Sequence, residues 1–117
     1  MRSREQLLAA HCRPVTSPAM SGDEVKRQLE MLPDWQLERG ALSRTFRFAD
    51  YYETIAFVNA IVHMIHSEDH HPDLRVGYDR CEVSFSTHSA GGITENDFIC
   101  AAKTDAIHAH RYGSAAA

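Results

Sequence analysis

The sequence predicts an α+β fold in which helices pack on one face of a four-stranded antiparallel sheet. Two stretches alternate apolar and polar residues with the period of two that marks half-buried strands, and each has a turn near its middle. Three further stretches repeat their apolar residues at the spacing of an amphipathic helix. The order of these elements is α-β-β-α-β-β-α, which gives one antiparallel sheet with helices covering one of its faces.

Length and composition indicate one globular domain. The chain has 117 residues, 44% of them hydrophobic and 24% charged, which is the balance of a folded water-soluble domain. With 12 basic and 16 acidic residues, the net charge is −4. Such a chain neutralises phosphates poorly, so we expect no direct nucleic-acid binding. The longest apolar run, residues 55–65, is interrupted by Asn59 and His63 and is shorter than the ~20 residues of a membrane span, so we expect no membrane insertion.

The domain is expected to occupy residues 21–112. A flexible extension over residues 1–20, broken by Pro14 and Pro18, precedes it, and a disordered tail over residues 113–117 follows. The extension carries three arginines and one acidic residue, which leaves organelle targeting open. Otherwise we expect a cytoplasmic protein, with the nucleus as an alternative.

Each predicted helix begins with a capping residue followed three positions later by an acidic residue. These pairs are Ser21 with Glu24, Asp50 with Glu53, and Thr94 with Asp97. The first helix should end near Met31, before Pro33. The second should end near His71, because Pro72 disfavours helical backbone in the residue before it.

The two hairpins lie between these helices. The first spans residues 35–48 and turns at Gly40. The second spans residues 74–87, with Asp79-Arg80 as its tight turn and Tyr78 as a packed strand residue.

The cysteines indicate free thiols. There are three, an odd number, and none belongs to a C-x-x-C pair, so a disulfide framework is not expected and a reducing compartment is favoured. Cys81 and Cys100 are expected to be small buried apolar residues.

Histidine is the unusual component of the sequence, with eight residues, several of them between His63 and His88. His66 and His70 are four residues apart on one helix face, a spacing that suits a metal ion. The adjacent His70 and His71 diverge by roughly 100° on a helix, and no H-E-x-x-H motif accompanies them, so we expect no metal. Two alternatives remain for the histidines. Either they occupy solvent-exposed positions on a helix, or His70, His71 and His88 act as acids and bases on different atoms of one ligand.

A longer pattern surrounds these histidines. The run His66-Ser67-Glu68-Asp69-His70-His71-Pro72 is followed by Tyr78, His88 and Asp97, separated by five, nine and eight residues in turn. This pattern resembles the signature of the pterin-4a-carbinolamine dehydratase family, also known as the dimerisation cofactor of a homeodomain transcription factor. One departure is His66, where many members carry Glu.

Other parts of the chain extend the resemblance. The segment Leu32-Pro33-Asp34-Trp35 and the phrase Ser84-Phe85-Ser86-Thr87-His88 are similar to family segments. The resemblance therefore covers roughly residues 21–109. It implies an enzyme that removes water from 4a-hydroxytetrahydrobiopterin to give quinonoid dihydrobiopterin, recycling the tetrahydropterin cofactor of aromatic amino-acid hydroxylases, without a metal or organic cofactor of its own.

The resemblance also implies roles for individual residues. Those implied in catalysis are His70, His71 and His88. Those implied in substrate binding are His71, His88, Trp35, Asp97 and His66. His70 would be the acid/base at the C4a hydroxyl, His88 the second acid/base, and His71 the residue that orients the pterin. Asp97 would hold a histidine or a backbone amide, while also completing the cap of the third helix. Trp35 would wall the pterin pocket or, alternatively, be a core residue.

Two further expectations concern partners. The family resemblance implies a homodimer or homotetramer and a functional link to an aromatic amino-acid hydroxylase. The alternative function is a protein-binding transcriptional coactivator that uses the same fold. Its surface would be the exposed face of the second helix, around Asn59, His63 and His66.

Overall fold

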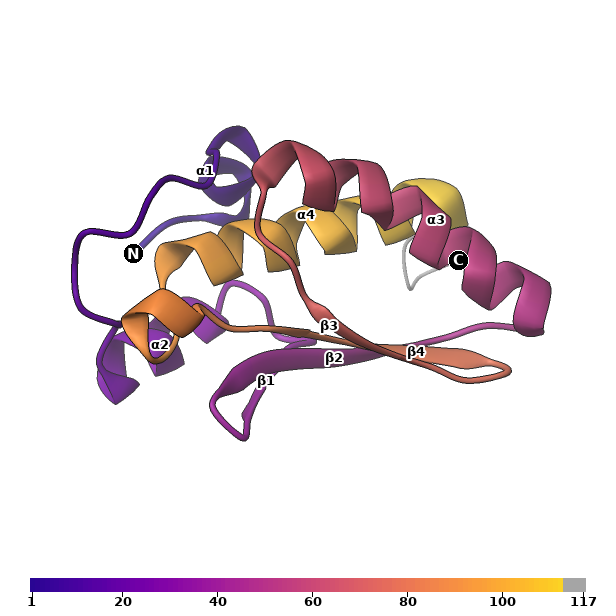
Figure 1. The fold of residues 1–117 in the computed structure, drawn as a ribbon, viewed down its shortest axis with the longest axis horizontal. Coiled ribbons are helices and arrows are strands. Elements are labelled where there is room, and N and C mark those ends of the chain that lie inside the picture. The colour runs from indigo at the N-terminus through magenta and orange to yellow at the C-terminus, as the bar shows by residue number, and fades with distance from the viewer. Residues whose placement is uncertain (113–117) are drawn as a thin grey trace.

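The structure is a computed structural model that describes residues 1–112, and in it a layer of helices covers one face of a four-stranded antiparallel sheet (Figure 1). The strands lie in the spatial order β1 (Gln36–Glu38), β2 (Ala41–Arg47), β4 (Arg80–Phe85), β3 (Asp73–Val76). The helices are α1 (Arg4–Ala9), α2 (Gly22–Leu29), α3 (Tyr51–Glu68) and α4 (Glu95–Tyr112), with a short 3₁₀ helix η1 (His88–Ala90). The predicted α+β fold is confirmed. The tail expected over residues 113–117 lies outside the described residues.

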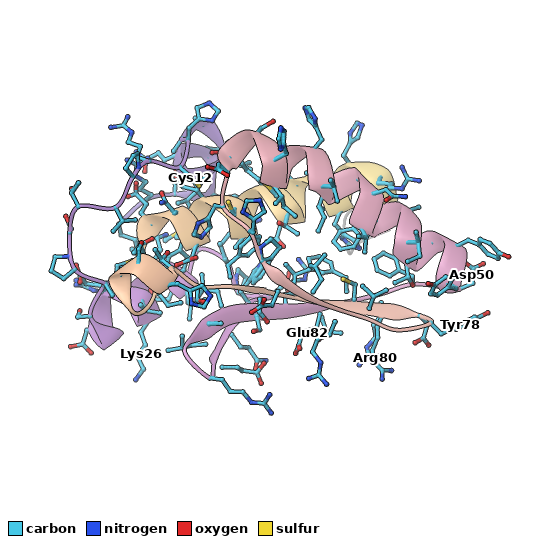
Figure 2. The ribbon with its side chains drawn as sticks, viewed as in Figure 1. Cys12, Lys26, Asp50, Tyr78, Arg80 and Glu82 are labelled. Carbon is cyan, nitrogen blue, oxygen red and sulfur yellow. The ribbon has the colours of Figure 1, made fainter. Side chains whose placement is uncertain are left out.

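The core lies between the sheet and helices α3 and α4. Leu42 and Phe46 of β2 are buried, and they pair with Phe85 and Cys81 of β4, which are also buried. The residues that alternate with these along β2 and β4 face away from the helices. There Ser43 and Ser84 share a hydrogen bond of 2.8 Å between their hydroxyls, and Glu82 projects from the same open face (Figure 2). The alternation read from the sequence therefore sorts the side chains between the two faces.

The predicted helix starts at Ser21 and Asp50 are confirmed. The Ser21 hydroxyl accepts from the amide of Glu24, whose carboxylate accepts from the amide of Ser21. The carboxylate of Asp50 accepts from the amide of Glu53 at 2.9 Å. The predicted end of α3 near His71 is wrong by about one turn. The helix ends at Glu68 because Asp69 adopts a left-handed conformation, with φ 50° and ψ 44°.

The hairpin turns differ in how well they were predicted. The first turn lies at Arg39 and Gly40, both with positive φ (52° and 77°), as a tight hairpin turn requires. In the second, β4 already begins at Arg80, and Tyr78 lies at the turn with 67% of its surface exposed (Figure 2). The predicted turn at Asp79-Arg80 is therefore displaced by one residue, and the prediction that Tyr78 is a packed strand residue is wrong.

The first twenty residues contain structure that the sequence prediction of a flexible extension left out. Helix α1 begins with a capping box between Ser3 and Gln6 and packs against α4. Leu7 is fully buried in the main core, and the amide of Arg2 donates to the side-chain oxygen of Gln28 at 3.0 Å. The Ser3–Gln6 pair was the local signal that marked this helix. None of the helices within residues 1–112 is long and apolar enough to cross a membrane.

Candidate active site

The candidate site is built around a short contact between His70 and Asp97. Nε2 of His70 lies 2.6 Å from Oδ1 of Asp97. His70 comes from the loop after α3, and Asp97 from the first turn of α4. Asp97 is fully buried, and the His70 side chain is 12% exposed. A histidine that contacts a buried carboxylate and keeps part of its side chain exposed can exchange protons with a ligand.

The carboxylate of Asp97 is itself held by two threonines. Its Oδ2 accepts from the Thr94 amide and from the Thr87 hydroxyl, both at 2.8 Å. The two threonine hydroxyls are also 2.8 Å apart. Asp97 therefore holds a histidine and a backbone amide at the same time, the two contacts that the sequence left as alternatives. Because its carboxylate is buried behind His70, Asp97 reaches a ligand through that imidazole.

This contact fixes the orientation of the imidazole. With Nε2 committed to Asp97, Nδ1 of His70 points away from the carboxylate, and it is the nitrogen that can give a proton to a ligand or take one from it. The ring lies parallel to that of Phe85, with centroids 6.1 Å apart and planes 10° apart. The carboxylate and the phenyl ring together limit how far the imidazole can turn.

Trp35 lies in the core, next to Phe85. Its ring centroid is 6.0 Å from that of Phe85, it is 3% exposed, and its Nε1 donates to Asp105 at 2.8 Å. In this structure Trp35 is thus a core residue that supports Phe85 from behind. The prediction that Trp35 forms the wall of a pterin pocket does not match this position, because almost none of its ring is open to a ligand.

The other three predicted histidines are exposed, and His71 and His88 directly follow His70 and Thr87 in the chain. His88 begins η1. His66 lies in the last turn of α3. Within residues 1–112, His70 is the one of these four whose side chain makes a hydrogen bond to protein. Exposed imidazoles next to His70 and next to Thr87 are in place to contact a ligand directly.

Glu68 is a neighbour of the site that sequence reasoning missed. Its buried carboxylate accepts from the Cys12 amide at 2.7 Å and contacts His11 Nδ1 at 2.8 Å and Lys103 Nζ at 3.0 Å. Burial raises the pKa of Glu68, but these three partners outweigh it and bring the pKa to about 2. The last residue of α3, just before the loop that carries His70, is thereby tied to the N-terminal segment and to α4. The partners are too distant in sequence for any local pattern to reveal this contact.

A cavity of about 390 Å³ lies beside the site but does not include its histidines. It is bounded by the loop from Arg13 to Met20 and by the start of α4, including Thr94 and Asn96. We do not assign the substrate to it.

Comparison with known proteins identifies the family of this chain. Residues 18–107 match the family model described as pterin 4 alpha carbinolamine dehydratase. A protein of Bdellovibrio bacteriovorus is 47% identical over 116 residues, covering 96% of each chain. A protein of Stenotrophomonas maltophilia is 64% identical over 81 residues, covering 68% of this chain and 70% of its own. Both carry pterin-4-alpha-carbinolamine dehydratase as a provisional name.

A solved structure gives the same result at the level of the fold. The transcriptional coactivator/pterin dehydratase of Brucella melitensis superimposes with a TM-score of 0.72 at 32% identity, covering 76% of this chain and 97% of the other. The match to the family model spans the sheet, the helices α2 and α3, most of α4 and all of the candidate site residues. The chain therefore belongs to the pterin-4-alpha-carbinolamine dehydratase family.

Proposed function

We propose that this protein dehydrates 4a-hydroxytetrahydropterin to quinonoid dihydropterin, as a hydro-lyase. The observation that carries the proposal is the His70–Asp97 contact of 2.6 Å, with His70 partly open to solvent. Family membership supports the choice of a pterin as substrate. The reaction needs a proton donor and a proton acceptor on one small ligand, and imidazoles supply both near neutral pH.

The proposed chemistry follows the atoms of the substrate. The C4a–O bond breaks as the hydroxyl leaves, and a proton from one histidine completes a water molecule. The proton on N5 is lost to a second histidine, and a C4a–N5 double bond forms. His70 is the proposed acid/base at the hydroxyl, and His88 is the proposed second acid/base. Asp97, held by Thr87 and Thr94, keeps the His70 ring in place.

The remaining predicted residues receive binding roles in this proposal. His71 would bind and orient the pterin, and His66 would contact it from the end of α3; both are exposed. His66 stands where many members carry Glu, so its imidazole would supply a donor or a cation in place of a carboxylate. Trp35 would act indirectly, by holding Phe85 against the ring of His70.

The test is the rate of dehydration of freshly generated 4a-hydroxytetrahydropterin, followed by its ultraviolet spectrum against the spontaneous reaction. The wild-type protein should accelerate dehydration, and His70→Ala combined with His88→Ala should lose on the order of 10²-fold or more. His63→Ala is the matched control, because His63 is an exposed histidine of α3 outside the motif. A folded wild-type protein no faster than the spontaneous reaction would refute the proposal.

The wider role is also part of this proposal. The enzyme would return the tetrahydropterin cofactor to an aromatic amino-acid hydroxylase, acting in the cytoplasm as a homodimer or homotetramer. Its pterin would be 4a-hydroxytetrahydrobiopterin or a close relative.

A second candidate function is protein binding as a transcriptional coactivator. It is favoured by the double name of the Brucella melitensis relative and by the exposed face of α3, where Val62 is 49% exposed beside His63. Copurification of a stable helical partner that is unaffected by His70→Ala would support it. If the protein with Val62 intact retains no partner on this face of α3, that result would count against the coactivator function.

A further inference from the structure

Two cysteines far apart in sequence lie together at the junction of the N-terminal segment and α4. Sγ of Cys12 is 3.5 Å from Sγ of Cys100, across a separation of 88 residues. Cys12 lies just after α1 and is partly exposed (Figure 2). Cys100 is fully buried in α4. Both are free thiols. The third cysteine, Cys81, is buried in β4.

The backbone on both sides of Cys12 is already fixed in this position. The Cys12 amide donates to Glu68 at 2.7 Å, and its thiol faces the carbonyl of Asn96 at 3.6 Å. The next residue, Arg13, exchanges two hydrogen bonds with the side chain of Asn96, at 3.1 Å and 2.8 Å. To form an S–S bond of about 2.05 Å, the two sulfurs need to approach by about 1.5 Å.

We propose that Cys12 and Cys100 are an oxidation site, which forms an intramolecular disulfide when the protein meets a peroxide. The thiolate of Cys12 attacks one oxygen of hydrogen peroxide, the O–O bond breaks, and a sulfenic acid forms at Cys12. The hydroxide that leaves takes up the proton that the Cys12 thiol had lost and becomes water. The sulfur of Cys100 then attacks the sulfenic sulfur, the S–S bond forms, and the hydroxyl leaves with the Cys100 proton as a second water. The two thiols together lose two electrons and two protons, and the peroxide is reduced to water.

The surroundings decide which thiol reacts first. The hydrogen bond with Cys12 and burial both raise the pKa of Cys100. Cys100 is therefore the protonated, protected partner, and the partly exposed Cys12 is the one that peroxide reaches. The resulting cross-link would join the N-terminal segment to α4 beside Glu68, the residue that ends α3 before the loop that carries His70. This inference does not depend on the proposed dehydratase activity.

The test is to treat the reduced protein with hydrogen peroxide, block the remaining thiols, and measure intact mass and non-reduced peptides. The wild-type protein should lose two of its three thiols and about 2 Da, with a peptide pair linking Cys12 to Cys100. Its Tm should rise by about 10 °C, and a reductant should reverse this rise. Cys81→Ala should behave the same, whereas Cys12→Ser should keep its reduced Tm after treatment.

Three outcomes would overturn the proposal. One is a Cys12–Cys12 link between two chains as the main product. Another is sulfinic acid at Cys12 with Cys100 still free. The third is a wild-type protein that retains all three thiols under peroxide that oxidises a free thiol in solution. Because Cys12 is partly exposed, Cys12→Ser should fold like the wild type, and circular dichroism checks this.

Discussion

His70 and Asp97 are 27 residues apart in the chain, yet Nε2 of one lies 2.6 Å from Oδ1 of the other. The carboxylate that holds the imidazole is fully buried and is itself held by a backbone amide and a threonine hydroxyl. The histidine side chain remains 12% exposed. Nε2 of the ring is therefore held by the protein, while part of the side chain stays open to solvent. This relationship is the basis of the first prediction.

Asp97→Asn should lower kcat for dehydration on the order of 10²-fold, with a smaller change in KM. The amide keeps the size of the side chain but removes the charge that fixes the orientation and proton of His70. The measurement is steady-state kinetics with 4a-hydroxytetrahydropterin, with Asp23→Asn as an exposed control in the first turn of α2. Equal kcat in the wild type and in folded Asp97→Asn would show that the contact has no catalytic role.

Glu68 should make the protein sensitive to acid. Its pKa is lowered from 4.5 to about 2 in the folded protein, so its stabilising contribution is present above about pH 4.5 and is lost as pH falls toward 2. Glu68→Gln should reduce the free energy of unfolding at pH 7 by on the order of 3 kcal/mol and flatten the pH dependence in this window. Thermal melts between pH 7 and pH 3 measure this, with the exposed Glu5→Gln as control. An unchanged slope in Glu68→Gln would contradict the prediction.

Leu7 should be part of the main core in solution. Leu7→Ala removes a fully buried side chain and should reduce the free energy of unfolding by about 2–5 kcal/mol. Urea denaturation measures this. Leu37→Ala is the matched control, because Leu37 is 47% exposed and its truncation should cost much less. If both variants have the stability of the wild type, helix α1 does not contribute to the folded unit.

Trp35 should act on stability more than on substrate binding. Trp35→Phe removes the buried hydrogen bond from Nε1 to Asp105 and should cost about 1–3 kcal/mol of unfolding free energy. Because Trp35 is almost fully buried and packs beside Phe85, KM for the pterin should change by less than about threefold, which is under 1 kcal/mol. Denaturation and kinetics on the same preparation separate the two effects. A large rise in KM with unchanged stability would restore Trp35 as a pocket wall.

Much of the fold could be read from local patterns. Alternation sorted Leu42 and Phe46 to the core face of β2, and the residues that cap α2 and α3 were visible as Ser21 and Asp50. The errors in the predicted element boundaries arose where a local signal limited the position of a boundary without fixing it. Pro72 required the helix to have ended before it, but the left-handed Asp69 ended it earlier. The position of the second turn depended on strand register, which pairs Val76 with Cys81 and leaves Tyr78 exposed.

The sequence by itself determined which residue types surround the candidate site, because the histidines and Asp97 lie at fixed spacings that need no structure to recognise. Only the tertiary structure decided what each of them contacts. Packing of α4 against the sheet and α3 brings Asp97 to His70, and packing of the N-terminal segment on α4 brings Cys12 to Cys100. The same packing buries Trp35 beside Phe85. Such contacts join residues 27 to 88 positions apart. Their geometry depends on how whole elements dock, and no local propensity encodes that.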